Sequence, residues 1–249
     1  GVLVQGAIAL ALWKVGAERI PESLELTRML ANAYTSEQDT AQAQTYVSKY
    51  KEIVESQRAR LDGVYGAQLT TLAKQTIRQR LETAGWEVLL LRARLAIAEN
   101  DLVAASDLSH QAFTSPLVLA NEQRLQAGRL LADCYIRREL WDMAGQTFDR
   151  CISLAPSDSS LRRGAAVAWR NAGTADRASH QLEKLDDGSF DAALEIARLT
   201  AMSEAAKEPE QADLAAVAKA AQLARSRYEQ ASPEAQALMH VWQLELLEL

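Results

Sequence analysis

Glycine and proline are scarce in this chain, with 11 glycines and 5 prolines among 249 residues. β-Branched residues are also few, whereas alanine and leucine dominate and hydrophobic residues make up 48% of the sequence. Such a composition favours an all-α protein, because strong helix formers are abundant and strand formers are not. The prolines fall at predicted helix boundaries, where the missing N–H group does least harm.

The residues that build catalytic and metal sites are scarce as well. The chain has two cysteines and three histidines, and none of them has a partner at metal-ligand spacing. It contains no P-loop, no G-x-G-x-x-G motif and no G-x-S-x-G motif. Asp186 and Asp187 form a carboxylate pair, but their place before Gly188 predicts a solvated turn. We therefore expect no catalytic residue, no metal site and no cofactor, and we expect that the chain is not an enzyme.

Positive charge and long apolar runs are also lacking. The formal net charge is −6, so composition gives no indication of nucleic-acid binding. No stretch of about 18 uninterrupted apolar residues exists, and the apolar run 2–13 is too short to span a membrane. Arginine outnumbers lysine and alanine is abundant, a bias that is associated with GC-rich bacterial genomes.

What the chain does contain is a repeat of 34 residues, with two consecutive copies over residues 125–192. Small and large residues recur in the same order in each copy, which suits two antiparallel helices that approach closely and a large side chain that fills the gap to the next pair. The first copy has Leu131, Ala132, Tyr135, Ala144, Phe148, Cys151 and Pro156. The second copy has Ala165, Ala166, Trp169, Ala178, Leu182, Leu185 and Phe190. The small slot held by Cys151 predicts a buried thiol, and Tyr135, Phe148 and Trp169 are predicted to be buried between adjacent helix pairs.

The run from Leu131 to Pro156 resembles the tetratricopeptide (TPR) signature L-G-x2-Y…A-x3-F…P. The resemblance implies an all-α fold, a right-handed superhelix (α-solenoid) of antiparallel helix pairs. In that family the concave face of the superhelix binds peptides or partner proteins.

The same register returns at residues 24–57, where Leu30, Ala31 and Tyr34 take the first-helix slots. One period earlier, Ala9 and Trp13 fall on second-helix slots, so the first helix of that repeat would precede residue 1. The last predicted helix, 234–249, also lacks a stop signal. We therefore expect a single repeat domain over residues 1–249 that is a fragment of a longer protein, with clear repeats at 24–57, 125–158 and 159–192.

The segments 58–124 and 193–249 are degenerate copies of the repeat. Residues 86–99 and 102–113 are predicted to form a helix pair, and Ser115-Pro116 is predicted to start a helix. The stretch 65–83 is either the end of one long second helix over 42–83, bent near Gly63 and Gly66, or an insertion. The long second helix is the preferred alternative. About eleven helices are expected in all.

The resemblance also indicates candidate ligand-binding residues, because TPR proteins contact ligands through fixed positions of the first helix. Position 5 is Arg28, Arg129 and Arg163 in the three clear repeats, position 9 is Asn32 or Asp133, and position 12 is Arg170. Arg28 with Asn32 resembles the first half of the family's carboxylate clamp, which holds the C-terminal carboxylate of a peptide. Three arginines on one face are expected to form a basic strip, since a guanidinium pairs bidentately with a carboxylate.

These observations predict a protein–protein interaction scaffold that binds a partner peptide or protein segment in its concave groove. The expected partner is acidic or carries a free C-terminal carboxylate, and self-association through the terminal repeats is a further possibility. The alternative is a helical regulatory or accessory segment of a larger bacterial enzyme or signalling protein.

Overall fold

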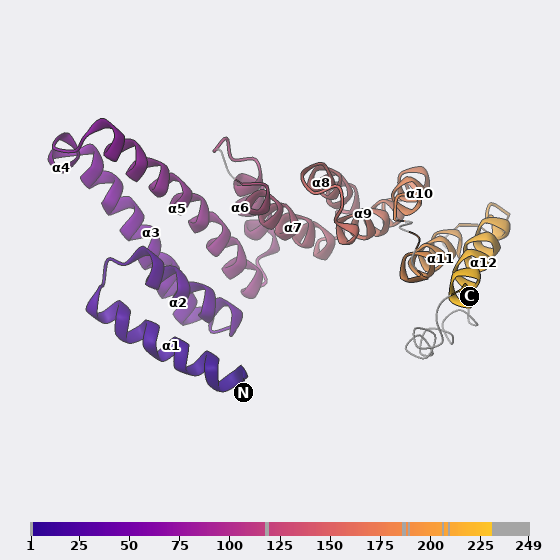
Figure 1. Ribbon diagram of the computed structural model, residues 1–249, viewed down its shortest axis with the longest axis horizontal. Helices are drawn as coiled ribbons and strands as arrows, with labels where there is room; N and C mark the ends of the chain where they lie inside the picture. Colours follow the sequence, from indigo (N-terminus) through magenta and orange to yellow (C-terminus); the bar gives the residue numbers. More distant parts are fainter. Residues whose placement is uncertain are drawn as a thin grey trace. The chain divides into compact units, whose positions relative to one another are not determined.

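The computed structural model describes residues 2–117, 120–185, 188, 190–205, 207–208 and 210–230 (Figure 1). The described residues contain twelve helices and no strand, so the predicted all-α fold is confirmed. About eleven helices were expected for the whole chain. The helices are α1 (Val2–Arg19), α2 (Leu24–Ser36), α3 (Thr40–Asp62), α4 (Val64–Ala67), α5 (Thr71–Ala98), α6 (Leu102–Phe113), α7 (Asn121–Arg137), α8 (Trp141–Leu154), α9 (Ser159–Asn171), α10 (Ala175–Glu183), α11 (Phe190–Ala205) and α12 (Leu214–Gln230).

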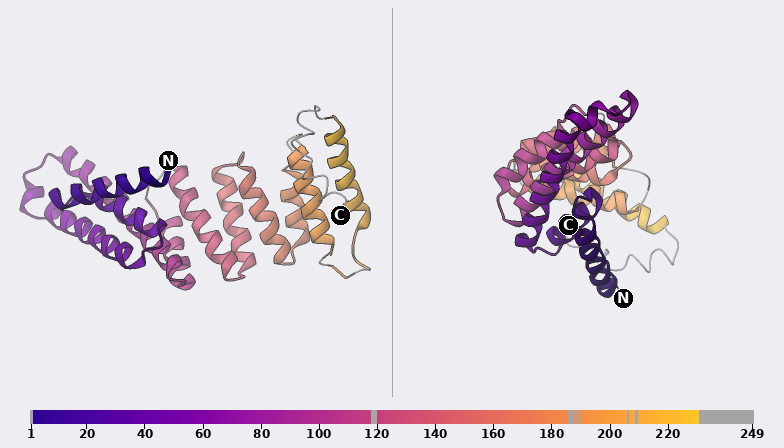
Figure 2. Two further views of the ribbon diagram at one scale, coloured as in Figure 1. Left: turned by 90° about the horizontal axis from the view of Figure 1, so that it is seen from below. Right: turned by 90° about the vertical axis from the view of Figure 1, so that its left-hand side faces the viewer.

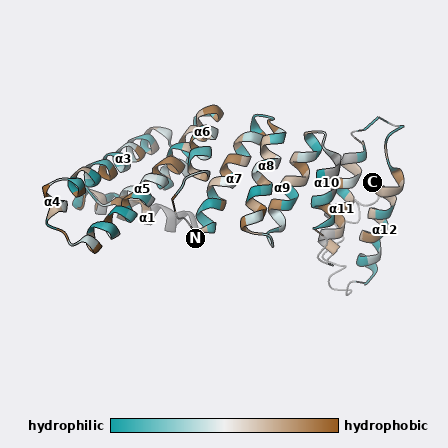
Figure 3. Cartoon of the chain, turned by 90° about the horizontal axis from the view of Figure 1, so that it is seen from above, coloured by the Kyte–Doolittle hydropathy of each residue, from teal (hydrophilic) through white to brown (hydrophobic). Residues whose placement is uncertain are grey.

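The helices belong to two compact units, residues 1–138 and residues 139–249. In the first unit α2 packs on α3, α3 on α5, α5 on α6 and α6 on α7, so that these five helices lie side by side in chain order (Figure 2). In the second unit α8 packs on α9, α9 on α10 and α11 on α12. Polar and apolar residues share each helix (Figure 3), as expected when one side of a helix is buried against its neighbours. That all of residues 1–249 form one repeat domain stays a prediction.

A left-handed turn residue marks the end of each first helix in four repeats. These residues have positive φ angles of 57° to 75° and are Gln38 after α2, Asn100 after α5, Glu139 after α7 and Gly173 after α9. The next residue closes the turn, since the N–H of Asp39 donates to Tyr34 O at 3.0 Å and that of Asp101 to Ala96 O at 2.8 Å. The same two aspartates then cap α3 and α6. The positions of this recurring turn can therefore be used to align the repeats with one another without reference to their buried residues.

The predicted long second helix over 42–83 is wrong. Helix α3 ends at Asp62, the short α4 follows, and Thr70 caps a new helix, α5, through the N–H of Ala73. The break between α3 and α4 falls at Gly63. The tight turn that follows requires glycine at position 66, because a Cβ atom there would lie 1.6 Å from Leu61 O. Residues 71–83 therefore extend the first helix of the next repeat, and α3 and α5 form one long antiparallel hairpin that ends in α4 (Figure 1).

The predicted pair 86–99 and 102–113 is confirmed within α5 and α6, but α5 begins earlier than expected. The predicted helix start at Ser115-Pro116 is wrong, because α7 begins at Asn121. There the side chain of Gln123 accepts a hydrogen bond from the Ala120 N–H. Gly173 lies in the turn between α9 and α10, and Pro156 lies between α8 and α9.

Burial follows the predicted slots in the three clear repeats. Tyr135 and Trp169 are buried, as are the residues in the small slots and both free cysteines, Cys134 and Cys151. Phe148 is the exception, because it is only half-buried and lies against the cluster of Ala165, Trp169 and Ala178. Its ring rests on α9 at Gly164, where a Cβ atom would lie 2.6 Å from the ring.

Two expectations fall on residues outside the described ranges, namely the helix 234–249 and the turn at Asp186 and Asp187. Among the helices that are described, none is both long and apolar enough to cross a membrane.

Candidate functional site on the first helices

The turn residues align α5 with the first helices on either side of it. Arg94 lies six residues before Asn100, as Asn32 lies six residues before Gln38 and Asp133 six before Glu139. By the same count Leu90 takes the position of Arg28, and Glu87 that of Glu25. Arg94 therefore takes in the degenerate repeat the position that Asn32 has in the repeat at 24–57.

Arg94 and Asn32 meet across the contact between α5 and α2. The Arg94 Nη1 donates to Asn32 Oδ1 at 2.7 Å, and the Asn32 Nδ2 donates to the backbone oxygen of Arg28 at 3.2 Å. Burial lowers the pKa of the half-buried Arg94 guanidinium from its usual value. No carboxylate pairs with Arg94 in the described part of the chain, which leaves its remaining donors without a charged partner.

A hollow of about 150 Å³ lies at this point, and α2, α5 and α7 all contribute to its lining. Arg28 and Asn32 come from α2, Arg94 from α5, and Gln123 and Gln126 from α7. Trp86 also lines the hollow and is fixed by its indole N–H, which donates to Ala112 O in α6 at 2.8 Å. We call this surface the first-helix face. Amide side chains and the Glu87 carboxylate line it beside the Arg94 guanidinium, which has no ion-pair partner among the described residues.

Arg28, unlike Arg94, is neutralised by acids. Its Nη2 lies 2.6 Å from Glu25 Oε1 and its Nη1 lies 3.9 Å from Glu87 Oε1. The other Glu87 oxygen accepts a hydrogen bond from the Tyr50 hydroxyl at 2.6 Å, and burial together with this bond raises the pKa of Tyr50. The ion pair of Arg28 and Glu87 thus lies at one edge of the first-helix face.

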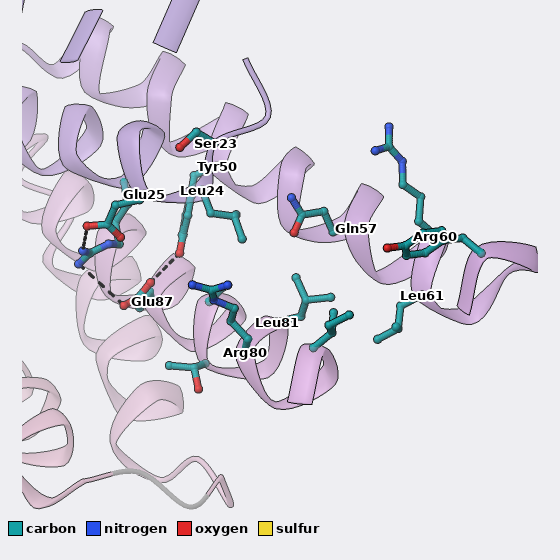
Figure 4. Close-up of a pocket in the computed structure, with 15 residues that line it drawn as sticks. Ser23, Leu24, Glu25, Tyr50, Gln57, Arg60, Leu61, Arg80, Leu81 and Glu87 are labelled. Carbon is teal, nitrogen blue, oxygen red and sulfur yellow. Dashed lines mark hydrogen bonds and ion pairs between the residues drawn. The ribbon is translucent and has the colours of Figure 1, made fainter. Parts of the chain in front are cut away.

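Beyond this boundary lies a larger hollow of about 930 Å³, which we call the hairpin notch (Figure 4). It is lined by the N-terminal turn of α2, the second half of α3 and the first half of α5. Leu61 and Leu81 are buried in its wall, and Gln57 and Arg80 point into it from α3 and α5. Arg60 is turned away and pairs with both oxygens of Glu22 at 2.8 and 3.0 Å.

The other predicted ligand residues have more ordinary surroundings. Arg129 is exposed on α7, and Asp133 pairs with Arg137 one helical turn later at 3.0 Å. Arg163 is exposed on α9, and Arg170 donates to the Asn171 side chain from Nε and Nη2. The structure thus brings Arg28 and Asn32 together with Arg94, and a groove shared by Arg28, Arg129 and Arg163 stays a prediction.

The sequence prediction missed Arg94 and Glu87 because the buried positions of α5 do not carry the residues of the TPR signature. A signal was present in the turn, where Asn100-Asp101 repeats the pattern of Gln38-Asp39. No group of three or more potential metal ligands occurs within the described ranges.

Paired antiparallel helices, small residues at their contacts and a repeated left-handed turn define a TPR-like α-solenoid. The chain is similar to a solved structure described as YrrB, a TPR protein with an unusual peptide-binding site. The two share 14% sequence identity with a TM-score of 0.55, over 95% of this chain and 98% of that one. At this identity the similarity shows the fold. The sequence matches no protein-family model and no curated protein.

Proposed function

We propose that this protein is an interaction scaffold whose first-helix face binds an acidic segment of a partner protein, with a carboxylate of that segment paired to Arg94. The observation that carries the proposal is the half-buried guanidinium of Arg94, whose one described partner is the neutral Asn32 side chain. The TPR-like fold supports a binding role rather than a catalytic one.

The energetic reasoning rests on desolvation. A guanidinium that has lost part of its hydration without gaining an anion carries an unfavourable free energy. A carboxylate that binds its free N–H groups offsets this desolvation free energy. It also adds charge-assisted hydrogen bonds, which contribute about 1.5–3 kcal/mol each. Arg28 does not offer this gain because Glu25 and Glu87 already pair with it.

A carboxylate can come from an acidic side chain or from the C-terminus of a peptide. The hollow next to Arg94 admits either, since Asn32, Gln123 and Gln126 supply amide groups around it. Peptides synthesised in pairs, with a free C-terminus or an amidated one, separate the two sources. Equal binding by both members of a pair assigns the contact to a side chain.

The test is a selection of peptides from a random displayed library against the full chain, followed by affinity measurements on variants. Arg94→Glu places a negative charge on the first-helix face, and we expect affinity to fall at least about tenfold, equivalent to about 1.4 kcal/mol. Arg92→Glu is the matched control, because Arg92 is an exposed arginine two residues away on the same helix.

Both variants must keep the helical circular dichroism of the parent protein. If Arg92→Glu weakens the selected peptides as much as Arg94→Glu does, the effect is one of overall charge and the proposal fails. It also fails if the selection enriches no acidic peptide.

A further inference from the structure

The hairpin extension, residues 58–80, carries a charge opposite to that of the protein. It contains five basic residues, Arg58, Arg60, Lys74, Arg78 and Arg80, and one acidic residue, Asp62, in a chain of net charge −6. A basic projection on an acidic protein favours encounters with an anionic partner. Its end is also apolar, with the side chains of Val64, Tyr65 and Leu72 between 58% and 80% exposed.

A hydrogen bond joins α3 to α5 at the base of the extension. The Nη2 of Arg58 donates to the backbone oxygen of Leu81 at 3.0 Å, across the gap between α3 and α5. Gly85 makes room for this side chain, because a Cβ atom there would lie 2.3 Å from the Arg58 Nη2. The wall of the hairpin notch is thus formed in advance, which reduces the entropy cost of binding there.

Some of the arginines around the notch already pair with an acidic side chain, and one does not. Glu22 occupies Arg60, and Arg78 pairs with Asp62 at 3.2 Å. Arg80 points into the notch, and it has no partner among the residues that the structure describes (Figure 4). Two carboxylates, Glu25 and Glu87, also line the notch, and both pair with Arg28. The notch therefore combines an apolar wall, formed by Leu61, Ile77 and Leu81, with one available guanidinium.

We propose that the hairpin notch is a second docking site, which takes an acidic protein segment that carries a large apolar side chain. The apolar side chain packs against Leu61, Ile77 and Leu81, and an adjacent carboxylate pairs with Arg80. The notch and the first-helix face share Arg28 and Glu87 at their boundary, but Arg80 lines only the notch and Arg94 lines only the first-helix face.

The geometry favours a protein segment over a lipid surface. A flat anionic membrane pairs best with cations that point outward, whereas Arg80 points into a hollow and the charges of Arg60 and Arg78 are already paired. A hollow of about 930 Å³ also has room for a large side chain and the backbone on either side of it.

The test uses the full chain carrying Arg94→Glu, so that the first-helix contact is removed and the two proposals are separated. A random peptide library is selected against this protein, and we expect enrichment of peptides with aspartate or glutamate next to leucine, phenylalanine or tryptophan. Binding of the enriched peptides is then compared in Arg80→Glu and Arg78→Glu versions. We expect at least about a tenfold loss for Arg80→Glu and less than about a twofold change for Arg78→Glu, which lies on the opposite side of α5.

Equal losses in the two versions overturn the proposal, as does enrichment of peptides without acidic or without large apolar residues. Failure to enrich any peptide above an unrelated control protein overturns it too. Cosedimentation with vesicles of phosphatidylcholine and phosphatidylserine is run beside these measurements. Vesicle binding that is lost equally in both arginine variants assigns the extension to an anionic lipid surface and contradicts the notch proposal.

Discussion

At the scale of single residues, small side chains are required where large rings cross the helix contacts. A Cβ atom on Gly145 in α8 would lie 2.6 Å from two ring carbons of Trp169 in α9, and Trp169 is 1% exposed. Gly164 in α9 has the same relation to Phe148 in α8. Each of the two facing helices thus places one aromatic ring over a glycine of the other helix.

The first prediction concerns Gly145→Ala. Alanine gains roughly 0.5–1 kcal/mol as a better helix former, but the clash with Trp169 costs about 1–3 kcal/mol, so we expect a net loss of stability. Urea unfolding followed by circular dichroism measures it. Gln146→Ala, at the exposed neighbouring position, is the control. A Gly145→Ala protein as stable as the control would show that Trp169 can move aside at no cost.

At the scale of elements, the sequence predicted helices better than it predicted their ends. The repeat at residues 24–57 was found because its buried slots keep the family pattern. In α5 the corresponding slots hold the exposed Arg92 and the small Ala96, where α2 has Leu30 and Tyr34. The pattern constrains only residues buried between helices, so it says little about how far α3 and α5 extend beyond those contacts.

The second prediction tests the junction that makes the long hairpin. Gly66→Ala forces a Cβ atom to within 1.6 Å of Leu61 O, whereas the same atom on Gly63 would be 3.3 Å from Ala59 O. We expect Gly66→Ala to increase amide hydrogen exchange in residues 62–72, because the backbone must shift there. Gly63→Ala should change exchange much less. Similar exchange in the two variants would contradict a steric requirement for glycine at position 66.

The third prediction concerns acid sensitivity between α11 and α12. Glu204 accepts from the Lys207 ammonium at 2.6 and 2.7 Å and from the Asp213 N–H at 2.7 Å, and these bonds lower its pKa from 4.5. The stability they give is present above the unfolded pKa and is lost as pH falls through the lower folded pKa.

We therefore expect the stability difference between the parent protein and Glu204→Gln, measured by urea unfolding, to shrink as pH falls below about 4.5. A difference that stays constant over this range would mean that the carboxylate charge contributes nothing.

At the scale of the whole molecule, the fold could be predicted from the sequence and the candidate site only in part. Arg28 and Asn32 were found because they belong to a clear repeat, whereas Arg94 lies in the degenerate segment. Among the described residues between Gln38 and Glu139, Asn100 is the single further left-handed turn residue. Residues 58–124 therefore hold the first and second helices of one extended repeat and not those of two ordinary repeats. The extra length lies in the hairpin extension, which supplies the hairpin notch.

The central claim is that partner segments bind the face formed by α2, α5 and α7. It is tested most directly by nuclear magnetic resonance titration of the full chain with a peptide selected as described above. We predict that the largest chemical-shift changes occur at the Asn32 and Gln126 side-chain amides and at the Arg94 guanidinium, and that Asp107 on α6 changes little. Changes concentrated on α6 and absent from Arg94 would contradict the claim and move recognition to the second helices.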